Sequence, residues 1–150
     1  MSYEIIKKVP TSEEIIRQIP LSSSGYANIA RHQQEIEAIL SGKDERKLLI
    51  VGPCSAWPSE AVLDYANRLL ELSKQVEDKI KIIMRVYIQK PRTAKGWTGP
   101  INQPNPLIEP DIEAGIWYCR KLMVQISELG LPIADECLFT HNARGFQELL

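Results

Sequence analysis

The sequence contains no apolar run that approaches the length of about 18 residues needed to cross a bilayer as a helix. Its first 20 residues alternate charged side chains with isoleucine and proline, which is not the pattern of a secretory signal. Only three cysteines are present, Cys54, Cys119 and Cys137, and no two of them have the C-x-x-C spacing of a metal or redox pair. These absences favour a cytoplasmic protein with reduced thiols and no membrane partner.

The sequence also lacks an excess of either positive or negative charge, since its formal net charge is -1 over 150 residues. Affinity for a nucleic-acid backbone comes from many basic residues on one face, so no nucleic acid is expected as a partner. Residues 79–108 depart from this balance, with six basic residues and no acidic one. The positive field is therefore local, and it suits a small anion.

Apolar periodicity predicts a helical N-terminal extension over residues 1–46, followed by alternating strands and helices over residues 47–150. In the extension, residues 11–14 have the pattern of a capping box that opens a short helix, and a second helix is expected over residues 26–41. Strands are then expected at 48–51, 80–88 and 131–138, and helices at 58–76, 111–129 and from 140 onward. The first strand is apolar throughout, so we expect it to be buried on both faces.

The alternation of strands and helices indicates an α/β fold with parallel strands joined by crossover helices. A (β/α)8 TIM barrel and an open doubly wound sheet both fit this order. No G-x-G-x-x-G follows the first strand, which removes the best support for a dinucleotide-binding open sheet. A barrel is therefore favoured, with the chain supplying the extension and about the first three β/α units. Because such barrels have about 250 residues, we expect the chain to be the N-terminal portion of a longer protein.

Unusual residues accompany all three predicted strands. Cys54 follows the first strand in a Gly-Pro turn, the second strand carries Arg85 and leads to Lys90 and Arg92, and Glu136 lies near the end of the third. In a barrel the ligand site lies at the carboxyl ends of the strands, so these residues are expected to converge at one rim. Guanidinium and ammonium groups together suit phosphate and carboxylate groups.

Structural alternatives apply to the thiols and the imidazoles. Cys54 is a metal ligand or nucleophile in one interpretation and a buried small hydrophobic residue in the other. For Cys119 and Cys137 we expect packing alone. His32 and His141 are expected at the surface rather than as ligands.

Alternatives also remain for the charged candidates. Strand alternation places Arg85 in the interior of a barrel, where it meets either a bound anion or a carboxylate such as Glu136. Glu136 takes part in proton transfer, orients a water or forms a structural salt bridge. Lys90 and Arg92 are either solvated loop residues or site residues aimed by the rigid backbone of Pro91.

Three groups of residues together resemble the type I 3-deoxy-D-arabino-heptulosonate 7-phosphate (DAHP) synthases. These groups are residues 49–55 with G-P-C-S, residues 84–93 with M-R-V-Y and K-P-R-T, and residues 96–102 with G-W, G and I-N. The related 3-deoxy-octulosonate 8-phosphate synthases resemble the chain less, because they carry an A-N-R-S type sequence after the lysine. The resemblance extends from the helical extension to Glu136.

The resemblance implies a TIM-barrel enzyme that condenses phosphoenolpyruvate with D-erythrose 4-phosphate, opening the shikimate route to aromatic amino acids. It implies one divalent metal ion, which could be Mn, Fe, Co or Zn, held by Cys54 and by further ligands outside this chain. The 150 residues alone are therefore expected to be inactive. A homo-oligomer, either a dimer or a tetramer, is also expected.

Carried over by position, the resemblance assigns both substrates. Arg85 and Lys90 would hold phosphoenolpyruvate, and Glu136 would lie beside it and place the attacking water. Lys90 and Glu136 are accordingly the expected catalytic residues. The erythrose 4-phosphate contacts would come from Pro91, Arg92 and Thr93.

The sequence departs from the family pattern in three places. Residues 56–58 are Ala-Trp-Pro where a histidine and an aspartate are usual, residues 103–106 replace an Asp-Pro-His pattern, and Phe139 occupies a usually acidic position. These departures leave the specificity for erythrose 4-phosphate and the feedback effector open. A non-catalytic paralogue or a truncated phosphate-binding module of the same fold is the alternative function.

Overall fold

The computed structural model describes residues 8–92, 95–136, 138 and 145–150, and it is a mixed α/β structure with a small parallel sheet. The elements in chain order are α1 (Ser12–Gln18), α2 (Ser23–Leu40), β1 (Lys47–Val51), α3 (Ser59–Val76), β2 (Ile80–Arg85), α4 (Ile112–Glu128), β3 (Ile133–Ala134) and the 3-10 turn η2 (Gln147–Leu149). This order confirms the predicted alternation of strands and helices. Over the described ranges, no helix is both long enough and apolar enough to span a membrane.

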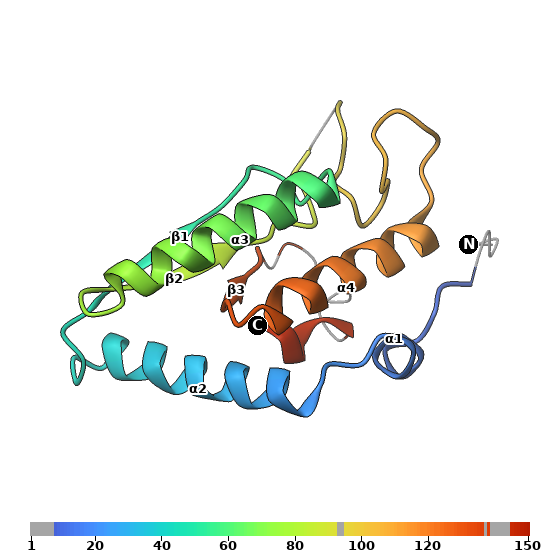
Figure 1. The fold of residues 1–150 in the computed structure, drawn as a ribbon. Coiled ribbons are helices and arrows are strands. Elements are labelled where there is room, and N and C mark those ends of the chain that lie inside the picture. Colours follow the sequence, from blue (N-terminus) through green and yellow to red (C-terminus); the bar gives the residue numbers. More distant parts are fainter. Residues whose placement is uncertain (1–7, 93–94, 137, 139–144) are drawn as a thin grey trace.

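The sheet has the order β1-β2-β3, and both strand pairs are parallel. Lys47 pairs with Ile80 at one end of the register, and Met84 pairs with both Val51 and Ile133 near the other. The helices α3 and α4 supply the crossovers. Figure 1 shows that the carboxyl ends of β1 and β2, the starts of α3 and α4 and the long loop before α4 all lie at one end of the molecule.

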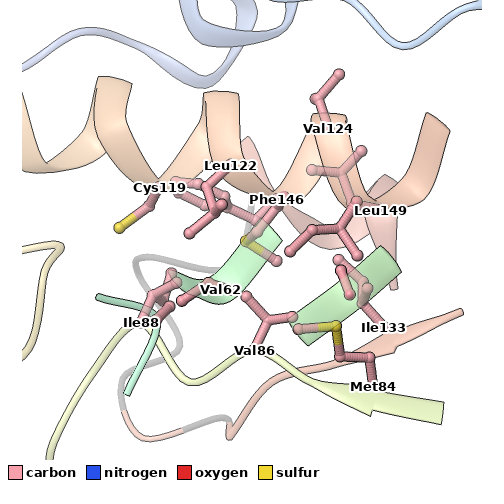
Figure 2. Packing of buried hydrophobic residues seen from close by; sticks show 14 of the residues in the cluster. Val62, Met84, Val86, Ile88, Cys119, Leu122, Val124, Ile133, Phe146 and Leu149 are labelled. Atoms are coloured by element: carbon pink, nitrogen blue, oxygen red, sulfur yellow. The ribbon is translucent and has the colours of Figure 1, made fainter. Parts of the chain in front are cut away.

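The core lies between the sheet and its helices. On the β2 line, Met84 and Val86 are fully buried, and Ile88 is nearly so. Figure 2 shows Val86 and Ile88 below Leu122 and Cys119 of α4, and Met84 beside Ile133 of β3. The predicted helix-facing side of this strand is therefore confirmed, because every second side chain packs under α4.

The prediction that β1 is buried on both faces is wrong. Leu49 is 43% exposed and Ile50 is 56% exposed. The reason lies in the sheet order, since β1 is an edge strand with β2 on one side and, among the described residues, no strand on the other. The apolar periodicity of residues 111–129 predicts that Ile112 faces the core, and this is also wrong, because this first residue of α4 is 49% exposed.

The helical extension is tied to the rest of the structure at its two helix junctions. The predicted capping box at Thr11 is present, and α2 begins three residues earlier than predicted because Ser22 caps it. The backbone amide and the hydroxyl of Ser22 both donate to Glu128 at the end of α4, each at 2.7 Å. The buried Arg120 of α4 donates to the carbonyl oxygen of Ile19 at 2.9 Å.

The predicted last strand and last helix are shorter in the described residues. β3 covers only Ile133–Ala134 of the expected 131–138. Most of the expected helix from residue 140 lies outside the described residues, and its described end is the single turn η2.

Candidate anion site at the carboxyl ends of the strands

The turn after β1 brings a thiol to the end of the sheet. Gly52 lies so close to β2 that a Cβ at this position would collide with the carbonyl oxygen of Arg85. Only a glycine therefore lets the two strands leave the sheet side by side. Beyond the turn, the amide of Ala56 donates to the carbonyl oxygen of Tyr87 at 3.0 Å, which fixes the segment that contains Cys54.

Cys54 is exposed, and the ammonium Nζ of Lys90 lies 3.3 Å from its Sγ. The hydrogen bond from Lys90 lowers the pKa of the Cys54 thiol, with further lowering by the positive charge of Lys90 and of the neighbouring arginines. The alternative of a buried packing residue is thus wrong for Cys54. It is confirmed for Cys119, which is fully buried, and burial raises the pKa of that thiol. Cys137 lies outside the described residues.

Arg85, the last residue of β2, points to the same turn. Its Nη2 donates to the carbonyl oxygen of Gly52 at 2.8 Å, and its Nε donates to that of Pro53 at 3.3 Å. The alternation of the strand places it on the face opposite Met84, as predicted. The predicted ion pair with Glu136 does not form among the described contacts, where carbonyl oxygens are the partners of Arg85 instead.

Tyr87 joins the two cations, which the sequence interpretation missed. The guanidinium carbon of Arg85 lies 4.9 Å from the centre of its ring, and Nζ of Lys90 lies 5.9 Å from the same centre. Such contacts stabilise a cation without neutralising its charge. The sequence could have indicated the contact between Tyr87 and Arg85, because residues two apart in a strand lie on the same face.

The loop after β2 folds back on itself and holds Lys90. The amide of Lys90 donates to the carbonyl oxygen of Thr98 at 3.0 Å, and the amide of Ile101 donates to that of Ile88 at 3.2 Å. Gly99 allows this close approach, because it has a φ of +99° and a Cβ there would lie 2.6 Å from the carbonyl oxygen of Ile88. As a result Lys90 is only 9% exposed although it lies in a loop.

Two of the departures from the family pattern contact the same aromatic residue. Trp57 and Trp97 form an edge-to-face pair with ring centres 6.1 Å apart. The indole Nε1 of Trp97 donates to the carbonyl oxygen of Gln103 at 2.8 Å. The changes at residues 56–58 and 103–106 are therefore linked in space through Trp97.

The remaining candidates are less closely engaged. Pro91 and Arg92 are exposed, and Thr93 lies outside the described residues. Glu136 is partly buried just beyond β3, and its carbonyl oxygen accepts from the amide of Leu138 at 2.9 Å. The structure thus brings Cys54, Arg85 and Lys90 together and leaves their roles toward a ligand to experiment.

Cys54 suits a divalent metal as a single ligand. Its exposure and the lowered pKa of its thiol favour the thiolate form, which is the form that binds metals. Over the described part of the chain, no group of three or more His, Cys, Asp and Glu side chains could hold a metal ion. The described residues therefore fit a metal through one donor only.

A further cation, Lys81, lies at the opposite end of β2 and contacts both a carboxylate and an imidazole. Lys81 is buried, and its Nζ lies 2.7 Å from Nδ1 of His32 and 2.9 Å from Oε2 of Glu35. Arg46 donates to the same Oε2 at 3.0 Å. Burial raises the pKa of Glu35, but the hydrogen bonds from Lys81 and Arg46 outweigh it and hold this pKa at about 2.

The surface location predicted for His32 is wrong. The ring is only 6% exposed, and its Nε2 lies 2.9 Å from the carbonyl oxygen of Gly130. That carbonyl can only accept, so Nε2 carries the proton and Nδ1 accepts from Lys81. Burial, and after it the charge of Lys81, lower the pKa of His32 to about 4. His141 lies outside the described residues.

A parallel sheet with a thiol and several cations at its carboxyl ends defines an α/β protein of the class whose ligand sites lie beyond the strand ends. Residues 19–150 match the DAHP synthetase I family. The chain belongs to this family.

Individual relatives agree with this assignment. The chain is 41% identical over 128 residues to the Tyr-sensitive phospho-2-dehydro-3-deoxyheptonate aldolase of Escherichia coli (strain K12), a match that covers 85% of this chain and 36% of that protein. It is 39% identical over 131 residues to the phospho-2-dehydro-3-deoxyheptonate aldolase of Corynebacterium glutamicum, covering 87% of this chain and 36% of that protein.

A solved structure of phospho-2-dehydro-3-deoxyheptonate aldolase from Francisella tularensis SCHU S4 superposes with a TM-score of 0.94 at 36% identity. The match covers 99% of this chain and 44% of that chain. The chain spans about 36% of the length of the two curated relatives described above.

Proposed function

We propose that the native protein that carries this chain condenses phosphoenolpyruvate with D-erythrose 4-phosphate, giving DAHP and phosphate, the first step of the shikimate pathway. Membership of the DAHP synthetase I family supports this reaction, as do relatives named phospho-2-dehydro-3-deoxyheptonate aldolases. In this proposal the protein is a (β/α)8 barrel, and residues 47–150 form its first part. The parallel strand order and the crossover helices support that architecture. A cytoplasmic location and a homo-oligomeric state remain predictions.

One observation carries the proposal: Arg85 and Lys90 lie at one rim with no carboxylate in an ion pair with either of them among the described residues. Their partners are two carbonyl oxygens, a thiol and an aromatic ring. The Cys54 thiolate can balance at most one of these two charges, and the remaining positive charge is unfavourable unless a ligand supplies a counter-charge. Phosphoenolpyruvate carries a phosphate and a carboxylate, and these are the groups that guanidinium and ammonium donors suit.

In the proposed reaction, Arg85 and Lys90 bind the enol phosphate and hold its C3 toward the aldehyde carbon of the second substrate. Binding of this kind brings together two anions that repel each other, and it stabilises the charge that develops as the carbon–carbon bond forms. Glu136 orients the water that adds at C2, after which phosphate leaves. Pro91, Arg92 and Thr93 form the proposed contacts to erythrose 4-phosphate.

Cys54 would hold the divalent metal in this proposal, together with ligands from outside this chain. A bound metal ion would polarise the aldehyde oxygen as a Lewis acid. The neighbouring Lys90 favours the thiolate that such a ligand requires, since its hydrogen bond lowers the pKa of the thiol.

The test is an assay of the product of the native reading frame with Mn²⁺ and both substrates. We expect phosphate release that requires both substrates, together with a seven-carbon product identified by mass spectrometry. Phosphoenolpyruvate binding without phosphate release would instead support the non-catalytic paralogue, an alternative that the departures around Trp97 favour. Because Gly96, the neighbour of Trp97, lies next to Arg92 of the proposed aldehyde site, a panel of aldose phosphates tests the choice of second substrate.

A further inference from the structure

Asp135 is a partly buried carboxylate that the proposed reaction does not use. It lies directly after β3, between Ala134 and the proposed catalytic Glu136. Its carboxylate accepts from the backbone amide of Ile88, just beyond β2. The question is what a carboxylate does at this junction.

The ladder between β2 and β3 has a regular two-residue repeat. The amide of Met84 donates to the carbonyl oxygen of Pro132, and the amide of Val86 donates to that of Ala134, both at 2.8 Å. In a parallel ladder the next donor on this side is the amide of Ile88. Its regular acceptor would be the backbone carbonyl two residues beyond Ala134.

That acceptor is replaced by a side chain. The amide of Ile88 donates to Oδ1 of Asp135 at 3.3 Å, whereas the carbonyl oxygen of Glu136 accepts from Leu138. One carboxylate of the β3 line therefore accepts from the β2 line at the point where the two backbones separate.

Both residues of this hydrogen bond lie next to proposed site residues. Ile88 is 3% exposed and precedes Lys90 by two residues, and the loop that returns past Lys90 is hydrogen-bonded to the carbonyl oxygen of Ile88. Asp135 directly precedes Glu136 in the chain. We infer that Asp135 is a positioning residue, whose carboxylate sets the distance between Lys90 and Glu136 across the proposed site. This inference rests on the proposed function.

Stability alone does not explain the choice of an ionisable group here. The pKa of Asp135 is raised to about 6, chiefly by burial and also by the charge of Glu136, although the hydrogen bond from the Ile88 amide acts in the opposite direction. A carboxyl whose pKa is higher in the folded state than in the unfolded state destabilises the fold as pH rises through about 4 to 6. At neutral pH the ionised Asp135 therefore costs stability, so the inference uses its acceptor oxygen and not its charge.

The test compares Asp135→Ala with Asp135→Asn in the product of the native reading frame. Asparagine keeps an oxygen at the acceptor position, whereas alanine removes it. We expect Asp135→Ala to lower kcat about 10- to 100-fold, because a displacement of about 1 Å is enough for such a loss. We also expect faster hydrogen exchange at the Ile88 amide. Asp135→Asn should keep both values within about threefold of the wild type.

Ile133→Val is the matched control, because it trims a buried side chain of the same strand and lowers the unfolding midpoint without touching the site. Its kcat should be unchanged. The inference is overturned if Asp135→Ala keeps the wild-type kcat, if alanine and asparagine are equally damaging, or if Ile88 exchange does not change. Should the wild type prove inactive, the proposed function fails, and the Ile88 exchange together with phosphoenolpyruvate affinity still decides the inference.

Discussion

A lysine lies at each end of the β2 line, and the two lysines have partners of different kinds. Lys81 has a carboxylate partner, whereas Lys90 has none among the described residues. At the start of the strand, Lys81 contacts a carboxylate and an imidazole, and Arg46 completes the group. Beyond the other end, Lys90 contacts a thiol and an aromatic face. The first group is complete within the described chain, whereas the second lacks an acid of its own.

This difference distinguishes a structural cation from a ligand-binding one. Glu35 neutralises Lys81, so that group needs nothing from solution, and its disruption leaves a buried charge. Carbonyl oxygens and rings orient Arg85 and Lys90 while leaving their charges available. Substitutions at the two ends should accordingly affect different properties, with activity changing at one end and stability at the other.

The largest expected effect is on catalysis at the carboxyl end. Replacing Lys90 by methionine should lower kcat/KM by about 100- to 1000-fold, because it removes a charged donor from a preorganised site. Lys95→Met, a change of an exposed lysine in the same loop, is the control and should stay within about threefold. Steady-state kinetics of the native protein decide between them. Equal losses in the two variants would mean that loop charge alone matters.

The next effect is on stability at the opposite end. Lys81→Met should lower the free energy of unfolding by about 3 kcal/mol, since it leaves Nδ1 of the buried His32 without a donor and removes one charged donor from the partly buried Glu35. Lys79→Met removes an exposed pair with Asp78 and should change that free energy by less than about 0.5 kcal/mol. Urea unfolding measures both. If Lys81→Met also abolished activity while folded, the separation of the two ends would be lost.

A smaller effect concerns pH and His32. Its pKa is lower in the folded state than in the unfolded state, so its contribution to stability is present above about pH 6.5 and declines as pH falls toward 4. Over that interval the wild type should lose about 2 kcal/mol relative to His32→Gln. Gln34→His adds an exposed imidazole to the same helix and should show no such slope. Unfolding curves at several pH values measure the difference, and parallel curves for wild type and His32→Gln would contradict the assignment.

The smallest effect is on thiol reactivity. Because Lys90 lowers the pKa of the Cys54 thiol, iodoacetamide should alkylate Cys54 at pH 7 several times faster in the wild type than in Lys90→Met. The buried Cys119 is the internal control and should react only on unfolding. Mass spectrometry of the labelled peptides gives both rates. An unchanged Cys54 rate in Lys90→Met would show that the contact has no electrostatic consequence.

The element order and the buried side of β2 were predictable, because apolar periodicity and strand alternation are local properties of the sequence. The exposure of Ile50 was not, since it depends on which strands lie beside β1. The burial of His32 could not be predicted, because its neighbours in the sequence are polar and its partner, Lys81, is 49 residues away.

Within the site, the motifs around Cys54 and Lys90 were sufficient to predict their convergence, which the 3.3 Å contact confirms. The role of Asp135 as a ladder acceptor could not be predicted, because it depends on the exact separation of two strands. The partners of Arg85 were missed for a similar reason, as backbone carbonyls leave no trace in a sequence.

The most direct test of the central claim is a calorimetric titration of phosphoenolpyruvate into the native protein and into its Arg85→Met and Lys81→Met variants. The account predicts that Arg85→Met weakens binding at least about tenfold, while Lys81→Met, where it is folded, binds as the wild type does. Equal affinities of the wild type and Arg85→Met would contradict the claim that the cations at the carboxyl end of β2 are kept for an external anion.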